Sequence, residues 1–166
     1  MANDRDVRLQ ELIALLRDRK LTVSFAESCT GGQLSAFVTE QAGISDIFMG
    51  SVVSYTNEAK IDVLGIRRDT LTNEGAVSVG IARQMAHGVR DKLKSSWSVA
   101  ITGIAGPSGG TPLKPVGTVC FAVTGPDFEE SRKEHFSGDR KDVQSQSVDY
   151  AVKFLTEALN GSAHKA

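Results

Sequence analysis

Two short apolar segments of this sequence each run directly into a cluster of glycines. Residues 21–26 are followed by Glu-Ser-Cys-Thr-Gly-Gly at 27–32, and residues 97–102 by Gly-Ile-Ala-Gly-Pro-Ser-Gly-Gly at 103–110. Short apolar runs bounded by turn-forming residues are typical of buried strands. Since such strands occur in sheets that helices cover, the two segments indicate an α/β fold with functional loops after the strands.

The rest of the chain alternates between helical and strand patterns. The predicted helices cover residues 5–19, 33–41, 57–64 and 79–94, and a last helix begins at Asp139 or Asp142. The predicted strands cover residues 21–26, 47–55, 97–102, 116–123 and 129–136. Asn57 and Ser78 are the expected N-caps of the third and fourth helices, because both residue types accept hydrogen bonds from free backbone N–H groups.

This order of elements predicts a three-layer α/β/α sandwich. Helices that alternate with strands favour parallel pairing, whereas the two consecutive strands late in the chain resemble a hairpin, so the sheet is expected to be mixed. We expect a single domain over residues 1–166, in which the polar segment 161–166 is a frayed tail.

The charge balance argues against several classes of protein. The chain has 19 basic and 20 acidic residues without a basic stripe, which disfavours nucleic-acid binding. No apolar run approaches the roughly 20 residues of a membrane helix, and the polar start Met1–Arg8 is unlike a signal peptide. We therefore expect a cytoplasmic protein with Cys29 and Cys120 reduced, and the spacing of the three histidines predicts no metal site.

Ser28 and Thr30 lie at the junction between the first predicted strand and a helix. Such a junction presents hydroxyls and free N–H groups at the positive end of the helix, which suits a phosphate or an oxyanion. The alternative is that both side chains are ordinary helix caps beside a glycine turn. Cys29 between them is a second possible nucleophile, although a free cysteine is more often a small buried hydrophobe.

Lys60 occupies an unusual place for a cation. With Asn57 as N-cap, it is the third residue of its helix, where the dipole disfavours a positive charge by about 0.3–1 kcal/mol. This is less than one pKa unit, so desolvation must supply most of any shift that makes the amine a base. The alternative is an exposed lysine on a solvated helix. Tyr55 could donate a hydrogen bond to Lys60 or to a nucleophile, or could simply pack.

The second glycine cluster resembles a P-loop only superficially. A Walker A motif needs Gly-Lys followed by Ser or Thr, whereas Gly110 precedes Thr111 and Pro112. The segment is therefore interpreted either as a loop that covers a ligand or as a structural turn.

Six segments, in order, resemble one family: the nicotinamide-nucleotide amidases, also known as the C-terminal domain of the competence/damage-inducible protein CinA. The segments are Ala26–Gly32 (AESCTGG), Ser54–Lys60 (SYTNEAK), Gly75–Ser78 (GAVS), Ile101–Gly110 (ITGIAGPSGG), Pro115–Thr118 (PVGT) and Gly138–Arg140 (GDR). Together they extend over nearly the whole chain. The resemblance is to the stand-alone form, without the N-terminal domain of full-length CinA.

The resemblance implies hydrolysis of nicotinamide mononucleotide to nicotinic acid mononucleotide and ammonia, with no metal or cofactor, by a homodimer or larger assembly. It implies that Ser28 is the nucleophile, Lys60 the base and Tyr55 a supporting hydroxyl. The expected substrate-binding residues are Thr30, Gly31, Gly32, Asn57, Thr102, Gly103, Gly106, Gly109 and Arg140.

Three points stay open at the level of the sequence. Arg140 suits a phosphate because its guanidinium is a planar fork, but it could equally pair with Asp139 or Asp142. The oxyanion donors are expected among the N–H groups of either Thr30–Gly32 or Gly103–Gly106. The alternatives to this activity are hydrolysis of another small carboxamide and a non-catalytic domain that binds pyridine nucleotides.

Overall fold

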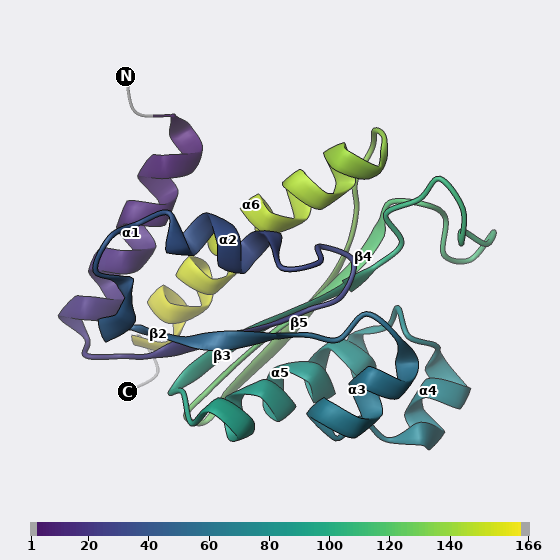
Figure 1. Ribbon diagram of the computed structural model, residues 1–166, viewed down its shortest axis with the longest axis horizontal. Helices are drawn as coiled ribbons and strands as arrows, with labels where there is room; N and C mark the ends of the chain where they lie inside the picture. The colour runs from purple at the N-terminus through teal and green to yellow at the C-terminus, as the bar shows by residue number, and fades with distance from the viewer. Residues whose placement is uncertain (1–2, 164–166) are drawn as a thin grey trace.

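The computed structural model describes residues 3–163 as three layers around one five-stranded sheet (Figure 1). The strands are β1 (Val23–Glu27), β2 (Phe48–Val53), β3 (Trp97–Gly103), β4 (Thr118–Gly125) and β5 (Phe128–His135). The helices are α1 (Asp4–Asp18), α2 (Gln33–Thr39), α3 (Asn57–Leu64), α4 (Arg68–Glu74), α5 (Val79–Leu93) and α6 (Arg140–Ala163), with a 3-10 turn η1 (Ile44–Asp46). This architecture confirms the predicted α/β/α sandwich.

The sheet has the order β2-β1-β3-β4-β5 and is mixed, as predicted. β1 pairs in parallel with β2 and β3, whereas β4 and β5 continue the sheet in antiparallel fashion. At the end of β1, Glu27 lies between Val53 of β2 and Ile101 of β3. The carboxyl ends of the three parallel strands therefore meet at one edge, which is where ligands bind in sheets of this kind.

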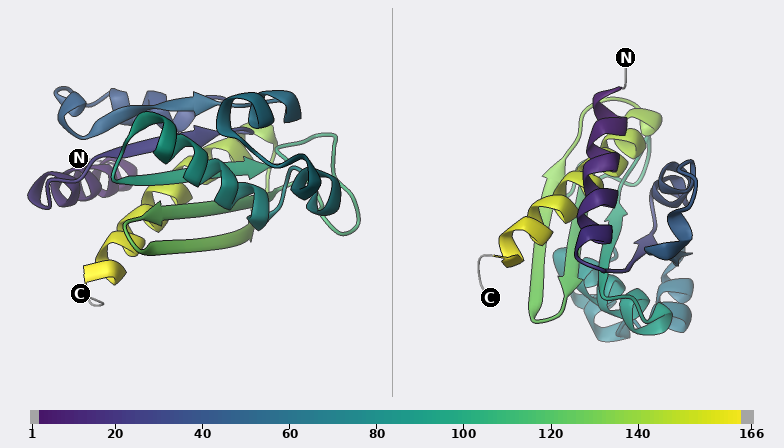
Figure 2. Two further views of the ribbon diagram at one scale, coloured as in Figure 1. Left: turned by 90° about the horizontal axis from the view of Figure 1, so that it is seen from below. Right: turned by 90° about the vertical axis from the view of Figure 1, so that its left-hand side faces the viewer.

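Helices cover both faces of the sheet because its central strands are apolar on both sides. All residues of β1 and β4 are buried. Helices α1, α2 and α6 lie on one face and α3, α4 and α5 on the other (Figures 1 and 2). Their apolar faces form two separate clusters with the sheet, one centred on α1 and α6 and one on α5. In the second cluster, Gly88 of α5 brings that helix so close to α3 that an added Cβ would lie 2.1 Å from the Leu64 carbonyl oxygen.

Several helix boundaries agree with the sequence patterns. Ser78 caps α5 by accepting a hydrogen bond from the Ile81 N–H, as predicted. Asp139 starts α6, because its Oδ1 accepts from the N–H of Asp142 at 3.0 Å while Asp142 Oδ2 accepts from the N–H of Asp139 at 2.9 Å. This reciprocal pair is a capping box made of two aspartates.

Two predicted boundaries differ from the structure, and one helix was not predicted. The N-cap of α3 is Thr56, whose hydroxyl accepts from the Ala59 N–H, so Asn57 is the first helical residue. Helix α4 was not predicted because it buries none of its residues and therefore shows no periodic apolar pattern. The predicted frayed tail is helical through Ala163, where α6 ends, and its last three residues lie outside the described range. Within the described part of the chain, no helix is both long and apolar enough to span a membrane.

Candidate active site

Ser28 and Lys60 meet at the carboxyl end of β1. Ser28 directly follows β1, and Lys60 projects from α3 so that its Nζ lies 2.8 Å from Ser28 Oγ. Both side chains are buried, with exposed fractions of 7% for Ser28 and 1% for Lys60. The structure therefore excludes the alternative that Lys60 is an exposed lysine on a solvated helix.

Two backbone carbonyls orient the Lys60 amine. Its Nζ donates to the Ser54 carbonyl at 2.8 Å and to the Tyr55 carbonyl at 3.4 Å, both in the segment that joins β2 to α3. A neutral amine has two hydrogens and one lone pair. When those hydrogens are directed to the two carbonyls, the lone pair faces Ser28 Oγ, which is the arrangement that a proton acceptor needs.

Burial changes the acidity of Lys60. Because the charged amine is removed from water, the pKa of Lys60 falls from 10.5 to about 8, and a negative charge on Cys29 would oppose this change. With a pKa of about 8, about a tenth of the amine is neutral at pH 7. Burial of the Lys60 side chain thus supplies the desolvation, and with it the pKa shift that the helix dipole alone could not provide.

Cys29 does not compete as a nucleophile. Its side chain is 4% exposed, and burial raises the pKa of its thiol to about 12. Since the thiolate is the reactive form, a thiol with this pKa is nearly unreactive at neutral pH. The backbone at Cys29 is held by Gln144 of α6, whose amide donates to the Cys29 carbonyl at 2.9 Å.

A cleft of about 310 Å³ opens beside the Ser–Lys pair. It is lined by Ser28, Cys29, Tyr55, Asn57, Lys60, Ala76, Val77, Thr102, Gly103, Ile104, Ala105, Gly106, Ser108, Gly109 and Arg140. Most of the expected substrate-binding residues are in this set. Ala76 and Val77, in the segment between α4 and α5, are not predicted as site residues, because apolar side chains in a loop carry no chemical signal of their own.

Thr30, Gly31 and Gly32 lie outside this lining. Thr30 is fully buried and its hydroxyl donates to Glu27 at 2.8 Å, while Gly31 and Gly32 have φ angles of +58° and +101° in the turn that leads into α2. Because Glu27 engages the Thr30 hydroxyl, that side chain does not line the cleft, and any role of Thr30, Gly31 and Gly32 in binding substrate stays a prediction that concerns their main chain. Within the described chain, the Thr30 N–H makes no hydrogen bond to a protein acceptor.

Arg140 joins two walls of the cleft. Its guanidinium donates to the Tyr55 hydroxyl at 2.6 Å and to the Gly106 carbonyl at 2.8 Å. In the part of the chain that the structure describes, it makes no ion pair with Asp139 or Asp142, which instead cap α6. The cleft lining contains the cations Lys60 and Arg140 and no acidic side chain, so it favours an anionic ligand.

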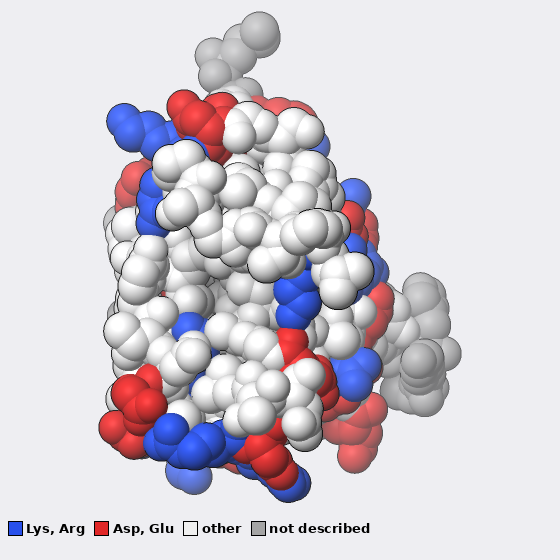
Figure 3. Space-filling view, turned by 90° about the vertical axis from the view of Figure 1, so that its right-hand side faces the viewer, with Lys and Arg blue, Asp and Glu red and all other residues white. Residues whose placement is uncertain are grey.

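The side of the molecule where the parallel strands end is largely uncharged. Figure 3 shows uncharged atoms over most of this side, with Lys, Arg, Asp and Glu along its lower edge and at its other margins. The charged groups along the lower edge are mixed in sign, so this face presents no continuous basic track for a nucleic acid.

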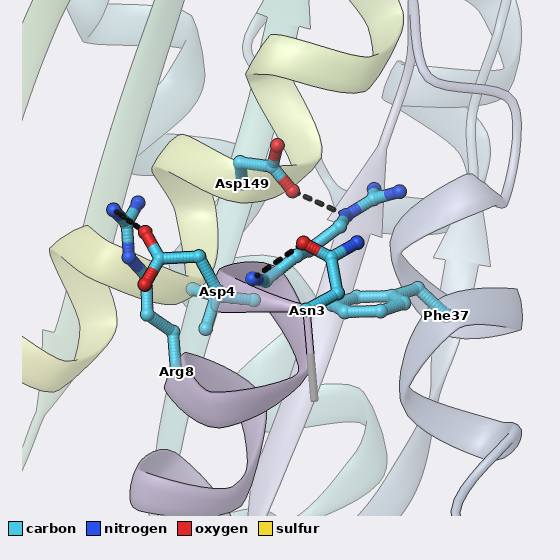
Figure 4. Close-up of a pocket in the computed structure, with 7 residues that line it drawn as sticks. Asn3, Asp4, Arg8, Phe37 and Asp149 are labelled. Atoms are coloured by element: carbon cyan, nitrogen blue, oxygen red, sulfur yellow. Dashed lines mark hydrogen bonds and ion pairs between the residues drawn. The ribbon is translucent and has the colours of Figure 1, made fainter. Parts of the chain in front are cut away.

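A second hollow of about 260 Å³ lies at the start of α1, against α2 and α6 (Figure 4). Arg5 there lies 4.2 Å from the centre of the Phe37 ring and forms an ion pair with Asp149, and Asp4 is paired with Arg8. Because its charges are paired with one another and it contains no nucleophile, this hollow is not the candidate active site. Among residues 3–163, no group of three or more His, Cys, Asp or Glu side chains is placed to hold a metal ion.

The fold and the site define a class: a three-layer α/β protein with a buried Ser–Lys pair at the carboxyl ends of parallel strands. The chain belongs to the CinA C-terminal domain family, whose model matches residues 6–159. It is 46% identical over 145 residues to a CinA-like protein of Fervidobacterium nodosum, covering 87% of this chain and 36% of that protein. With a CinA-like protein of a Cyanothece species it shares 49% identity over 160 residues, covering 95% and 38%.

Solved structures agree with this assignment. The CinA superfamily protein of Klebsiella pneumoniae 700603 matches with a TM-score of 0.91 and 33% identity, over 96% of this chain and 99% of that one. A competence/damage-inducible protein from Agrobacterium tumefaciens matches with a TM-score of 0.91 and 38% identity, over 96% and 98%. The chain spans little more than a third of the length of the curated relatives it matches.

Proposed function

We propose that this protein hydrolyses the carboxamide of a small anionic nucleotide, nicotinamide mononucleotide, to a carboxylate and ammonia. The observation that carries the proposal is the 2.8 Å contact between a buried lysine amine and a serine hydroxyl in an open cleft. A lysine with a lowered pKa beside a serine is an arrangement that activates the hydroxyl for attack on a carbonyl.

The reaction proceeds in two halves. Neutral Lys60 takes the proton of Ser28 as its oxygen attacks the carboxamide carbon, and the resulting ammonium delivers that proton to the departing ammonia. Water then attacks the acyl-serine ester with Lys60 again as base, which releases the carboxylate and restores the serine hydroxyl. Each half needs Lys60 to be neutral at its start.

Free backbone N–H groups beside Ser28 are available for the oxyanion. The N–H groups of Cys29 and Thr30 follow the nucleophile directly and, within the described residues, donate to no backbone carbonyl. We assign them to the developing negative charge, where one such donor typically stabilises the transition state by about 2.7–4 kcal/mol. In this assignment Thr30 contributes its main chain, while its side chain binds Glu27.

Arg140 and Tyr55 are assigned to the anionic part of the substrate. The Arg140 guanidinium lines the cleft together with Tyr55, and its planar fork suits a phosphate. The cleft volume of about 310 Å³ fits a small molecule. Asn57, Thr102, Gly103, Gly106 and Gly109 form the walls between the two ends.

We further propose that the protein acts in the cytoplasm as a homodimer. β2 is an edge strand, Met49 and Val53 on it are each 47% exposed, and residues 47–57 contain no charged side chain. An exposed edge strand without charges is a template on which a second chain can pair. Sedimentation velocity of Val53→Lys tests this: we expect the variant to be monomeric at concentrations where the original protein is dimeric, and an unchanged dimer refutes the choice of β2.

One experiment distinguishes the proposed activity from two alternatives, a non-catalytic binding domain and an amidase that acts on another carboxamide. Ammonia release from nicotinamide mononucleotide is measured for the original protein, Ser28→Ala and Lys60→Ala, with Ser98→Ala and Lys92→Ala as matched controls away from the cleft. The proposal predicts turnover that is lost in the first two variants and kept in the controls. Tight binding without turnover indicates a binding domain, and turnover of a different carboxamide alone indicates another amidase.

A further inference from the structure

Glu27 is a buried acid that the proposed reaction does not use. It is the last residue of β1, directly before Ser28, and its side chain is completely inaccessible to solvent. An isolated buried carboxylate is strongly disfavoured, so a buried acid must be fully hydrogen-bonded. The contacts of Glu27 meet this condition.

Four donors converge on the Glu27 carboxylate. Oε1 accepts from the Thr30 hydroxyl and from the Leu34 N–H, both at 2.8 Å. Oε2 accepts from the N–H and the hydroxyl of Ser35, at 3.1 and 2.6 Å. The four contacts connect the residue before the nucleophile to the turn after it and to the first turn of α2.

The main chain on either side of this carboxylate is also fixed. The Ser28 N–H donates to the Ile101 carbonyl at 3.0 Å, and the Glu27 carbonyl accepts from the Ser54 N–H at 2.9 Å. Successive side chains point to opposite faces of a strand, so Glu27 faces α2 while Ser28 faces Lys60. The sheet thus fixes where the nucleophile lies along β1, and Glu27 fixes the turn that follows it.

We infer that Glu27 is a positioning residue, whose carboxylate holds the turn 28–32 so that Ser28 Oγ and the N–H groups after it face the same point in the cleft. This inference rests on the proposed role of Ser28 as nucleophile. Glu27 is not among the residues that line the cleft, and Lys60 donates no hydrogen bond to it. It acts through the hydroxyl of Thr30 and through the backbone N–H groups at the start of α2.

Glu27→Gln is the most informative substitution because it keeps the shape and removes an acceptor. Each carboxylate oxygen accepts one backbone N–H, from Leu34 or from Ser35. Hydroxyls can rotate, but these N–H groups cannot, so either orientation of the amide places an NH₂ against a backbone donor. The turn must move to relieve this contact, and a misplacement of about 1 Å at a catalytic group lowers rates by about 100-fold.

The test measures the rate at which phenylmethanesulfonyl fluoride sulfonylates Ser28, followed by intact-mass spectrometry. The serine oxygen forms a bond to sulfur, fluoride leaves, and the proton goes to Lys60. For Glu27→Gln we expect the rate to fall about 10- to 100-fold, with the midpoint of its pH dependence unchanged. Ser98→Ala, which removes a buried serine hydroxyl hydrogen-bonded at 2.7 Å to the Ala86 carbonyl, controls for lost stability and retains the original rate.

Each outcome decides the inference. An unchanged rate in folded Glu27→Gln overturns it, and so does a shifted midpoint with an unchanged plateau, which indicates an electrostatic effect on Lys60. If Glu27→Gln does not fold, Thr30→Val and Ser35→Ala replace it. The labelling rate is expected to fall about 3- to 10-fold in each of these variants. Labelling at the original rate in both of them refutes the inference. If Ser28 is labelled but the protein does not turn over nicotinamide mononucleotide, only the proposed substrate is refuted. If the original protein is not labelled at all, the roles of Ser28 as nucleophile and of Glu27 as positioning residue are refuted together.

Discussion

Replacing Lys60 by methionine should make the protein more stable at neutral pH and inactive. Methionine has a similar length and fills the same buried space without a charge. In the folded protein, burial lowers the pKa of Lys60 from 10.5 to about 8, so the protonated amine is held there at a cost. The substitution removes this cost.

The magnitude follows from the two pKa values. One pKa unit corresponds to about 1.4 kcal/mol, so the difference between 10.5 and about 8 destabilises the folded state by about 3 kcal/mol at pH values below 8. The variant also leaves the carbonyls of Ser54 and Tyr55 without their donor, which costs about 1–2 kcal/mol. We therefore expect a net gain in the free energy of unfolding of about 1–2 kcal/mol, or about 3–6 °C in melting temperature.

The sign of the pH dependence distinguishes this explanation from simple repacking. Between about pH 8 and 10.5 the unfolded chain binds the lysine proton and the folded protein does not, so the original protein gains stability as the pH rises. The advantage of Lys60→Met is constant below pH 8, shrinks above it and reaches zero between about pH 9 and 10. Above about pH 10.5 the variant is less stable by about 1–2 kcal/mol, the cost at the two carbonyls. Other titrating groups are shared by both proteins and cancel in the comparison.

Urea unfolding followed by circular dichroism at pH 6, 7, 8, 9 and 10 measures this difference. Lys92→Met, on the exposed face of α5, is the matched control and should change stability by less than about 0.5 kcal/mol at every pH. A stability difference for Lys60→Met that does not vary with pH would falsify the reasoning, because the amine would then have the same pKa in the folded and unfolded chains.

Three further predictions concern the cleft and the packing. Turnover should rise about tenfold per pH unit up to about pH 8 and then level off, because neutral Lys60 is the base; a rise that continues to pH 10 in a pH–rate profile contradicts this. Arg140→Ala should lower kcat/KM for nicotinamide mononucleotide about 10- to 100-fold, mainly through KM, because charge-assisted hydrogen bonds are lost. The unphosphorylated nucleoside serves as the control substrate, and equal losses for both would exclude phosphate binding. Gly88→Ala should lower the free energy of unfolding by about 1–3 kcal/mol, since its Cβ would overlap the Leu64 carbonyl. Gly161→Ala, with open space around it, should be neutral or stabilising by up to about 1 kcal/mol in thermal unfolding, and similar melting temperatures for the two variants would show that the close contact is unimportant.

Much of the fold could be predicted because burial leaves a periodic signal in the sequence. The buried strand β4 contains a continuous apolar run, and α6 buries one apolar stripe along its length. Helix α4 has no such signal. None of its residues is buried, so polar residues are tolerated along its whole length. The N-cap of α3 was misplaced by one residue because Thr56 and Asn57 are both good caps, and only the backbone conformation selects between them.

The candidate site was predictable by residue type but not by environment. Ser28, Lys60 and Arg140 stand out as chemical groups after strands or at helix starts, yet their burial depends on which elements pack around them. Glu27 was missed as a separate group, although an acid at the end of a wholly buried strand is itself a signal that donors must be nearby. The resemblance placed Thr30 at the ligand, but sequence spacing could not show that its hydroxyl binds Glu27.

The Ser–Lys pair and much of the opposite wall of the cleft come from different stretches of the chain. The reacting pair comes from residues 28 and 60, held by β1, β2 and α3, whereas much of the opposite wall comes from residues 102–109 and from residue 140. Copies of such a gene can therefore diverge in one stretch and keep the other. Changes in the loop after β3 alter which molecules are admitted while the serine and lysine stay in contact, and loss of the lysine leaves a receptor for the same molecules.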